Sequence, residues 1–94
     1  MVKHIIFWKL KEENKEENAQ GIRTRLEGLV GVVPGLMRAE VRFPFNNPDF
    51  DVCLYSEFES RVALDGYQEH PAHVMAAKFV RSVVVNRICC DYEA

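Results

Sequence analysis

The segment KHIIFWKL, residues 3–10, carries large apolar side chains at both odd and even positions. Its β-branched and aromatic residues favour an extended strand, in which successive side chains point to opposite faces. The two faces are His4, Ile6, Trp8 and Leu10 on one side and Lys3, Ile5, Phe7 and Lys9 on the other. A strand that faces water on one side would alternate between apolar and polar residues. We therefore expect this strand to be covered on both faces.

The rest of the chain divides into alternating strand and helix patterns. Apolar residues at three- and four-residue steps predict a helix that ends around Val33, where Gly31, Pro34 and Gly35 stop it. Strands are expected at 36–43, with Met37 and Val41 on one face, and at 50–58, with a turn rich in Pro and Asn between them. Ser60 can cap a further helix. Pro71 interrupts that helix, a second helical piece starts near His70, and a fourth strand, 85–92, closes the chain.

The resulting order, β-α-β-β-α-β, predicts an α+β ferredoxin-like domain over residues 1–94, with a four-stranded antiparallel sheet and helices on one face. The other face then needs a cover, and a second copy of the same sheet is the simplest one. We expect a homodimer with facing sheets, because most homo-oligomers are two-fold dimers. The predicted interface residues are Ile5, Phe7, Cys53 and Tyr55.

Composition limits the partners and the compartment. The net charge of −2 offers no basic surplus for phosphate contacts, so no nucleic acid is expected. No apolar stretch approaches the ~18 residues needed to cross a bilayer, and the start of the chain does not resemble a signal peptide, so no membrane is expected. The three cysteines, Cys53, Cys89 and Cys90, form no disulfide framework and are interpreted as reduced, packed thiols of a cytoplasmic protein.

The segment YQEHPAHV, residues 67–74, holds the candidate chemistry. Histidine titrates near neutral pH and suits a base, and tyrosine suits a neutral hydrogen-bond donor, so this segment carries side chains for acid/base chemistry. The strand phase that places Ile6 and Trp8 toward the helices also places His4 there. The expected apolar substrate pocket, between sheet and helices, is lined by Ile6, Trp8, Leu26, Val52, Leu54 and Phe79.

Structural roles compete with this interpretation. His70 can cap a helix, while His4, His73 and Tyr67 can be satisfied core residues. His70 and His73, three residues apart, could share a helix face as metal ligands together with His4. A zinc site needs three or four convergent ligands and no carboxylate is well placed, so no metal and no cofactor is expected. No cysteine has an evident activating base, which argues against a thiolate nucleophile.

Several segments, VKHIIFWKLKEE, VPGL, DVCLYSEFES, YQEHPAHV and CDYE, together resemble the stress-responsive α/β-barrel (Dabb) family along essentially the whole chain. The resemblance implies a ferredoxin-like domain paired into a dimeric α+β barrel. By resemblance to the cyclase-type members, Tyr67 and His73 correspond to an acid/base pair and His4 to a pocket histidine. Leu26 and Val52 stand where those members carry a tyrosine and a histidine, so the same substrate is not expected.

Three hypotheses of function follow. The first is a stress-responsive dimeric protein that binds a small apolar or aromatic molecule in its barrel pocket, with no established catalysis. The second is a polyketide-cyclase-like lyase or isomerase that needs no cofactor and uses His73, Tyr67 and His4. The third is a purely structural oligomer. An enclosed space shared by Tyr67 and His73 would separate the first two hypotheses from the third.

Overall fold

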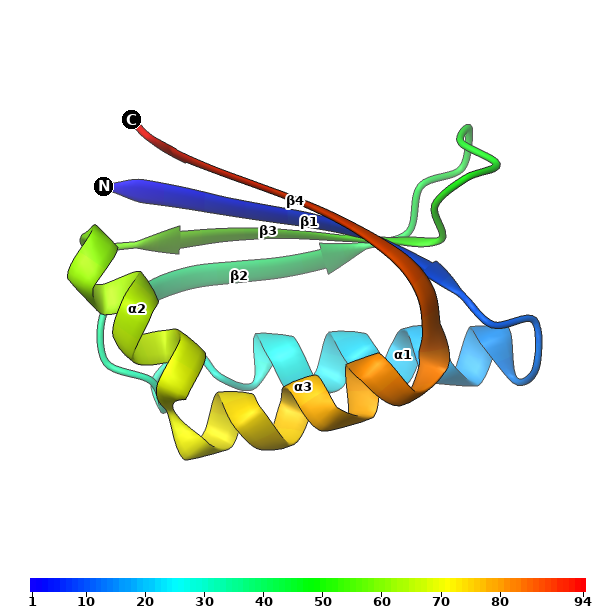
Figure 1. Cartoon of the computed structure of the whole chain (residues 1–94), viewed down its shortest axis with the longest axis horizontal. Coiled ribbons are helices and arrows are strands. Elements are labelled where there is room, and N and C mark those ends of the chain that lie inside the picture. Colours follow the sequence, from blue (N-terminus) through cyan, green and yellow to red (C-terminus); the bar gives the residue numbers. More distant parts are fainter.

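A computed structural model describes all 94 residues of the chain. The elements are β1 (Val2–Leu10), α1 (Lys15–Glu27), β2 (Leu36–Arg42), β3 (Val52–Phe58), α2 (Arg61–Glu69), α3 (Pro71–Val83) and β4 (Val84–Glu93) (Figure 1). The four strands form one antiparallel sheet in the order β2-β3-β1-β4. This is the ferredoxin-like α+β fold, which confirms the predicted fold class.

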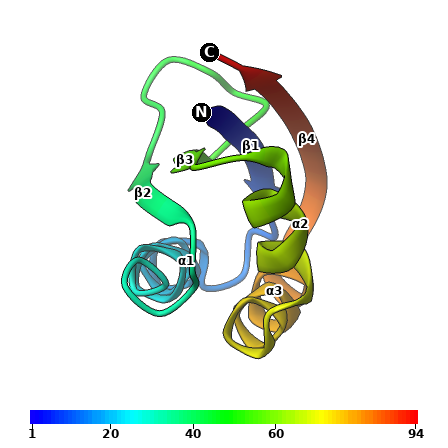
Figure 2. The ribbon, with the colours of Figure 1, turned by 90° about the vertical axis from the view of Figure 1, so that its left-hand side faces the viewer.

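The helices all lie on one side of the sheet, and the core fills the space between the two layers (Figures 1 and 2). Strand β1 occupies the centre between β3 and β4. Its helix-facing residues are at most 5% exposed: Val2, His4, Ile6, Trp8 and Leu10. The predicted alternation of β1 is therefore correct, and it brings one polar side chain, His4, into an otherwise apolar layer.

Helix α1 ends earlier than its apolar pattern predicted. It stops at Glu27, with Gly28 as its C-cap, and not around Val33. Residues 28–33 instead form turns, in which Leu29 donates its N–H to Leu26 and Val32 donates to Leu29. Leu29 and Val33 are still buried, so the turns keep helical spacing at the core. This is why the pattern continued beyond the helix itself.

A register shift near the start of β2 also departs from the expected alternation. The pairing with β3 skips a residue between Leu36 and Arg38. Leu36 and Val41 point into the core, whereas Met37 is 48% exposed. The prediction that Met37 shares a face with Val41 was wrong, because one extra residue at a bulge moves the preceding side chains to the other face.

The junction of α2 and α3 forms as the residues 60–71 suggested. The Ser60 hydroxyl accepts a hydrogen bond from the Ala63 N–H at 3.1 Å and caps α2. His70 lies between the helices in an extended conformation, and its Nδ1 accepts from the Ala72 N–H at 3.1 Å. Pro71 occupies the first turn of α3, where its missing N–H is not needed. The junction thus explains His70 as a helix cap.

No helix covers the second face of the sheet. The four predicted interface residues, Ile5, Phe7, Cys53 and Tyr55, lie on this open face, opposite in strand phase to the buried residues of β1 and β3. Phe7, Ile88 and Tyr92 are 37%, 50% and 49% exposed there. The loop between β2 and β3 rises on the same side, and its Phe45 is 96% exposed (Figures 1 and 2).

The free thiols are less packed than expected. Cys89 and Cys90 are exposed and Cys53 is partly buried, so the interpretation of all three as packed groups was wrong. The reason is that Cys89 and Cys90 lie on β4, which forms an edge of the sheet. Among the helices, none is both long enough and apolar enough to span a membrane.

Two glycines test how β2 and α2 are held together. Gly35 has φ of +81°, and a Cβ there would lie 2.5 Å from the Ala63 Cβ on α2. We expect Gly35→Ala to lower the free energy of unfolding by about 2–4 kcal/mol, since backbone strain and overpacking add.

Gly31 is the matched control. Its φ is +88°, but a Cβ there meets nothing within 4 Å. Gly31→Ala should cost only about 1 kcal/mol of strain. Urea denaturation measures both variants, and equal losses would contradict the close packing of Gly35 against α2.

Candidate functional site

A pocket of about 320 Å³ opens between the helix-facing side of β1 and β4 and the helices α2 and α3. It combines an apolar wall, two histidines, two arginines and an amide. Its lining residues are His4, Ile6, Trp8, Gln68, His73, Ala77, Val80, Arg81, Val84 and Arg87. A cavity of this size suits a small organic molecule.

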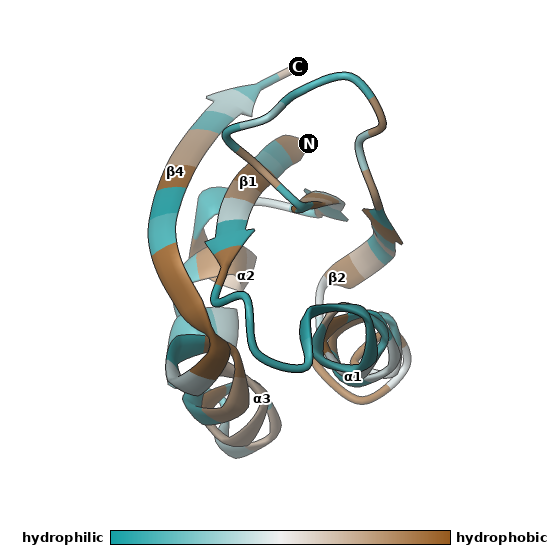
Figure 3. Cartoon of the chain, turned by 90° about the vertical axis from the view of Figure 1, so that its right-hand side faces the viewer, coloured by the Kyte–Doolittle hydropathy of each residue, from teal (hydrophilic) through white to brown (hydrophobic).

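The strand register turns three polar side chains of β4 toward the helices, and one of them, Arg87, lines the pocket. Arg87 pairs with Trp8, Cys89 with Ile6 and Asp91 with His4, so these three share the helix-facing side. Figure 3 shows bands of apolar and polar residues along β4. An edge strand whose helix-facing side carries an arginine and a carboxylate cannot be sealed by apolar packing, and the pocket lies there.

His4 is held by a carboxylate. It is 2% exposed, and its Nδ1 lies 2.5 Å from Oδ1 of Asp91. The rings of Phe58 and Tyr67 meet it edge-on, with centroids 6.0 and 6.2 Å away. Because Asp91 engages Nδ1, Nε2 is the ring nitrogen left for other partners. The sequence analysis missed Asp91, since the contact joins residues 87 positions apart and depends on the register of β4.

Tyr67 and His73 lie side by side across the bend between α2 and α3. Their ring centroids are 4.1 Å apart with 40° between the planes. Tyr67 is 3% exposed and also packs against Phe58, whereas His73 lines the pocket. Nδ1 of His73 is buried and has no hydrogen-bond partner in the protein. Tyr67 does not line the pocket, so Tyr67 and His73 do not share the enclosed space that was expected of a binder or an enzyme.

Burial sets the charge states of this pair. Burial lowers the pKa of His73. The backbone of Gln68 beside the ring raises this pKa, while the charges of His4, Arg81 and His70 lower it further. Burial raises the pKa of Tyr67, so its phenol stays protonated. A neutral imidazole beside a neutral phenol can accept a proton from a ligand without first losing one.

The other predicted pocket residues fill the core. Leu26, Val52 and Leu54 are at most 4% exposed and belong to the main apolar cluster. Phe79 packs beneath Arg25, whose guanidinium carbon lies 3.8 Å from the ring centroid. None of these four lines the pocket, whereas Ile6 and Trp8 do. The space near α1 is filled by side chains, which leaves the pocket toward β4.

One cluster offers the donor atoms of a metal site. Nδ1 of His4, Sγ of Cys89 and Oδ1 of Asp91 lie within 4.8 Å of one another. Burial raises the pKa of the Cys89 thiol, and Asp91 raises it further. The 2.5 Å contact of His4 with Asp91 is a hydrogen-bond distance, shorter than the roughly 3.3 Å between two tetrahedral zinc ligands. As arranged, the three residues form a hydrogen-bonded pair with a thiol beside it. His70 is occupied as a helix cap and does not join them.

Comparison with known proteins places this fold in a class of small ferredoxin-like domains. A dimeric protein of unknown function from Bacteroides fragilis shares 30% identity and a TM-score of 0.90, covering 99% of this chain and 95% of that chain. A dimeric ferredoxin-like protein of unknown function from Jannaschia sp. shares 20% identity and a TM-score of 0.88, covering 99% and 98%. A hydroxynitrile lyase from Passiflora edulis shares 18% identity and a TM-score of 0.84, covering 97% and 90%.

The model of the stress responsive A/B barrel domain, Dabb, matches residues 2–94. The chain therefore belongs to this family, as its motifs indicated. Among curated proteins, no sequence matches the chain. The two lower identities establish the fold alone, so function has to be argued from the site.

The lowered pKa of His73 can be measured directly. In an NMR pH titration of the imidazole nitrogens, we expect His73 to titrate below its ordinary value of 6.5, because burial disfavours the charged ring. As the pH falls through 6.5 toward the folded-state pKa, the unfolded chain takes up more protons at this position. The free energy of unfolding then falls, and His73→Asn should lose that part of the pH dependence. A His73 that titrates above 6.5 would contradict this account.

Proposed function

We propose that this protein binds a small apolar or aromatic molecule in the pocket beside His4 and His73. The observation that carries the proposal is the buried Nδ1 of His73, which makes no well-aligned hydrogen bond, although its ring lines a pocket and the backbone of Gln68 lies beside it. A buried polar atom without a hydrogen bond costs about 1–3 kcal/mol, and native proteins leave few of them. A ligand that moves in to bond Nδ1 itself would recover this cost, while Ile6, Trp8 and Val80 offer an apolar wall.

Trp8 gives a direct readout of binding, because it is the single tryptophan of the chain and lines the pocket. We expect 2-naphthamide, a neutral aromatic probe, to shift the NMR signal of the Trp8 indole N–H in a saturable way. Trp8→Phe removes the signal but keeps an aromatic wall, so shifts of the His73 ring should persist in that variant. If no aromatic probe moves either signal, the structural-oligomer hypothesis stands instead.

We further propose that the protein is a homodimer in which the open sheet faces of two chains meet. We also propose that it works in the cytosol, where its three free thiols stay reduced. The open face carries Phe7, Ile88 and Tyr92 with a third to a half of their surface exposed. An apolar patch of this kind on a small domain marks an interaction surface. Two structurally similar proteins are described as dimeric.

Ile5→Lys should break the dimer, because it places a charge in the middle of the open face opposite Tyr55 and Cys90. Val62→Lys is the control, since Val62 is 79% exposed on α2, away from that face. Light scattering at micromolar concentration should show a dimer for the original chain and for Val62→Lys, and a monomer for Ile5→Lys. A monomeric original chain would contradict the facing-sheet arrangement.

Acid/base catalysis is the second candidate, and the contact of His73 with Tyr67 favours it. A neutral His73 could remove a proton from a carbon next to a carbonyl, leaving an enolate and an imidazolium; the imidazolium would then protonate the enolate, which forms the product and restores the neutral base. A lyase or isomerase of this kind needs no cofactor. The hydroxynitrile lyase with the same fold shows only that the fold can carry a lyase.

Hydrogen–deuterium exchange on a small ketone distinguishes the enzyme hypothesis from the binding hypothesis. With 2-tetralone in D₂O, an enzyme should accelerate deuterium incorporation at the carbon next to the carbonyl, as followed by NMR. His73→Gln should lower this acceleration by about 100-fold or more, in line with the contribution of a positioned base. The matched control is His70→Asn, which removes a histidine outside the pocket and leaves a good helix cap. An unchanged rate in His73→Gln would contradict the assignment of the base.

A further inference from the structure

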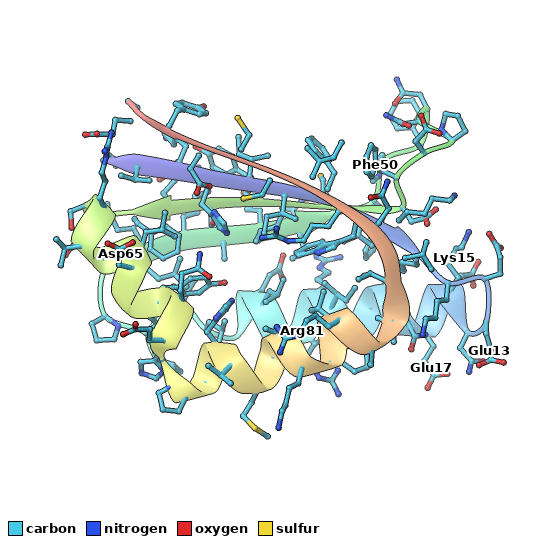
Figure 4. All side chains as sticks on the ribbon, viewed as in Figure 1. Glu13, Lys15, Glu17, Phe50, Asp65 and Arg81 are labelled. Atoms are coloured by element: carbon cyan, nitrogen blue, oxygen red, sulfur yellow. The ribbon has the colours of Figure 1, made fainter.

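We infer that the ligand of this pocket carries a carboxylate, held by Arg81 and Arg87 while its apolar part packs on the wall formed by Ile6, Trp8 and Val80. The inference rests on the proposed binding function and specifies the class of molecule. Arg81 comes from α3 and Arg87 from β4, so the two guanidinium groups belong to different walls of one pocket (Arg81 is labelled in Figure 4).

The first support is that these two arginines lack ionic partners. Neither forms a salt bridge with any carboxylate of the chain, and no acidic residue lines the pocket. The other five arginines are engaged: Arg23, Arg38, Arg42 and Arg61 in ion pairs, and Arg25 over the Phe79 ring. In a chain of net charge −2, carboxylates are in excess, yet none meets this pair.

The second support is the environment of the pair. Both arginines are exposed residues that line one partly apolar pocket, and an anion bound between them would offset the repulsion of their charges. A planar guanidinium matches a carboxylate with two parallel hydrogen bonds, and apolar walls strengthen such bonds by excluding water. Gln68 adds an amide that can donate to the same group. Aromatic or branched aliphatic carboxylates match the pocket, because their apolar part fits the apolar wall and their carboxylate fits the arginines.

The third support links the anion to His73. Burial is the main cause of the lowered pKa of His73; the Gln68 backbone opposes it, and the charges of His4, Arg81 and His70 add to it, while Tyr67 on α2 is neutral. A carboxylate bound to Arg81 would offset this charge, so the His73 pKa should rise when an anion binds. The ligand's charge would thereby set the proton affinity of the imidazole beside it.

The test compares 2-naphthoate, ionised at neutral pH, with 2-naphthamide, which is nearly the same shape and neutral. The probes are titrated into the full-length protein while the Trp8 indole and His73 imidazole signals are followed by NMR. We expect 2-naphthoate to bind about tenfold tighter or more, the range of a charge-assisted hydrogen bond. The His73 pKa should rise with 2-naphthoate and not with 2-naphthamide.

Substitutions at the two arginines should remove the preference. In Arg81→Gln and Arg87→Gln, affinity for 2-naphthoate should fall about tenfold toward that of 2-naphthamide, whose own affinity should change little. Arg61→Gln is the control, because Arg61 pairs with Glu93 outside this pocket and should leave both affinities unchanged.

The outcomes distinguish the two proposals. Equal affinity for both probes would overturn the carboxylate inference and leave the binding function in place. A preference for 2-naphthoate that survives the double variant Arg81→Gln/Arg87→Gln would also overturn the inference. Failure of both probes to bind would overturn the binding function and the inference together.

Discussion

The structure depends on strand β1, which is apolar on both faces and lies in the middle of the sheet. One face builds the core against the helices, and the other is left without a cover in the single chain. A strand of this kind forces the sheet to be an inner layer, with helices on one side and another apolar surface on the other. The same strand phase places His4 on the helix-facing side beside Ile6 and Trp8. The alternation that buries the apolar residues of β1 therefore also positions a residue of the site.

The site arises where this layered packing is incomplete. Strand β4 presents Arg87, Cys89 and Asp91 to the helix side, and polar groups there need partners that apolar packing cannot give. Asp91 pairs with His4, while Arg87 lines the pocket. Across the pocket, the bend at Pro71 lets α3 start in a new direction, so that His73 stacks on Tyr67. A helix cap at His70 and a pocket-lining histidine at His73 thus come from one short segment.

Much of the fold could be predicted from local patterns, and the pocket only in part. The strand phases and the α2–α3 junction follow from rules that act within a few residues, as Ser60 and Pro71 illustrate. The end of α1 could not be read from its apolar spacing, because Leu29 and Val33 keep that spacing in turns beyond Gly28. Leu26, Val52 and Leu54 point inward as pocket residues would, but core and pocket share one periodicity and only packing separates them. Arg87 and Asp91 enter the site through the register of β1 with β4, which no local pattern shows.

The space between β1, β4 and α3 is proposed as a binding site for an apolar carboxylate, and a crystal structure of the protein grown with 2-naphthoate is the sharpest test of this proposal. We expect the naphthyl ring against Ile6 and Trp8, the carboxylate between Arg81 and Arg87, and His73 within hydrogen-bond distance of the ligand. A structure in which side chains fill this space, or in which the probe binds only elsewhere, would contradict it.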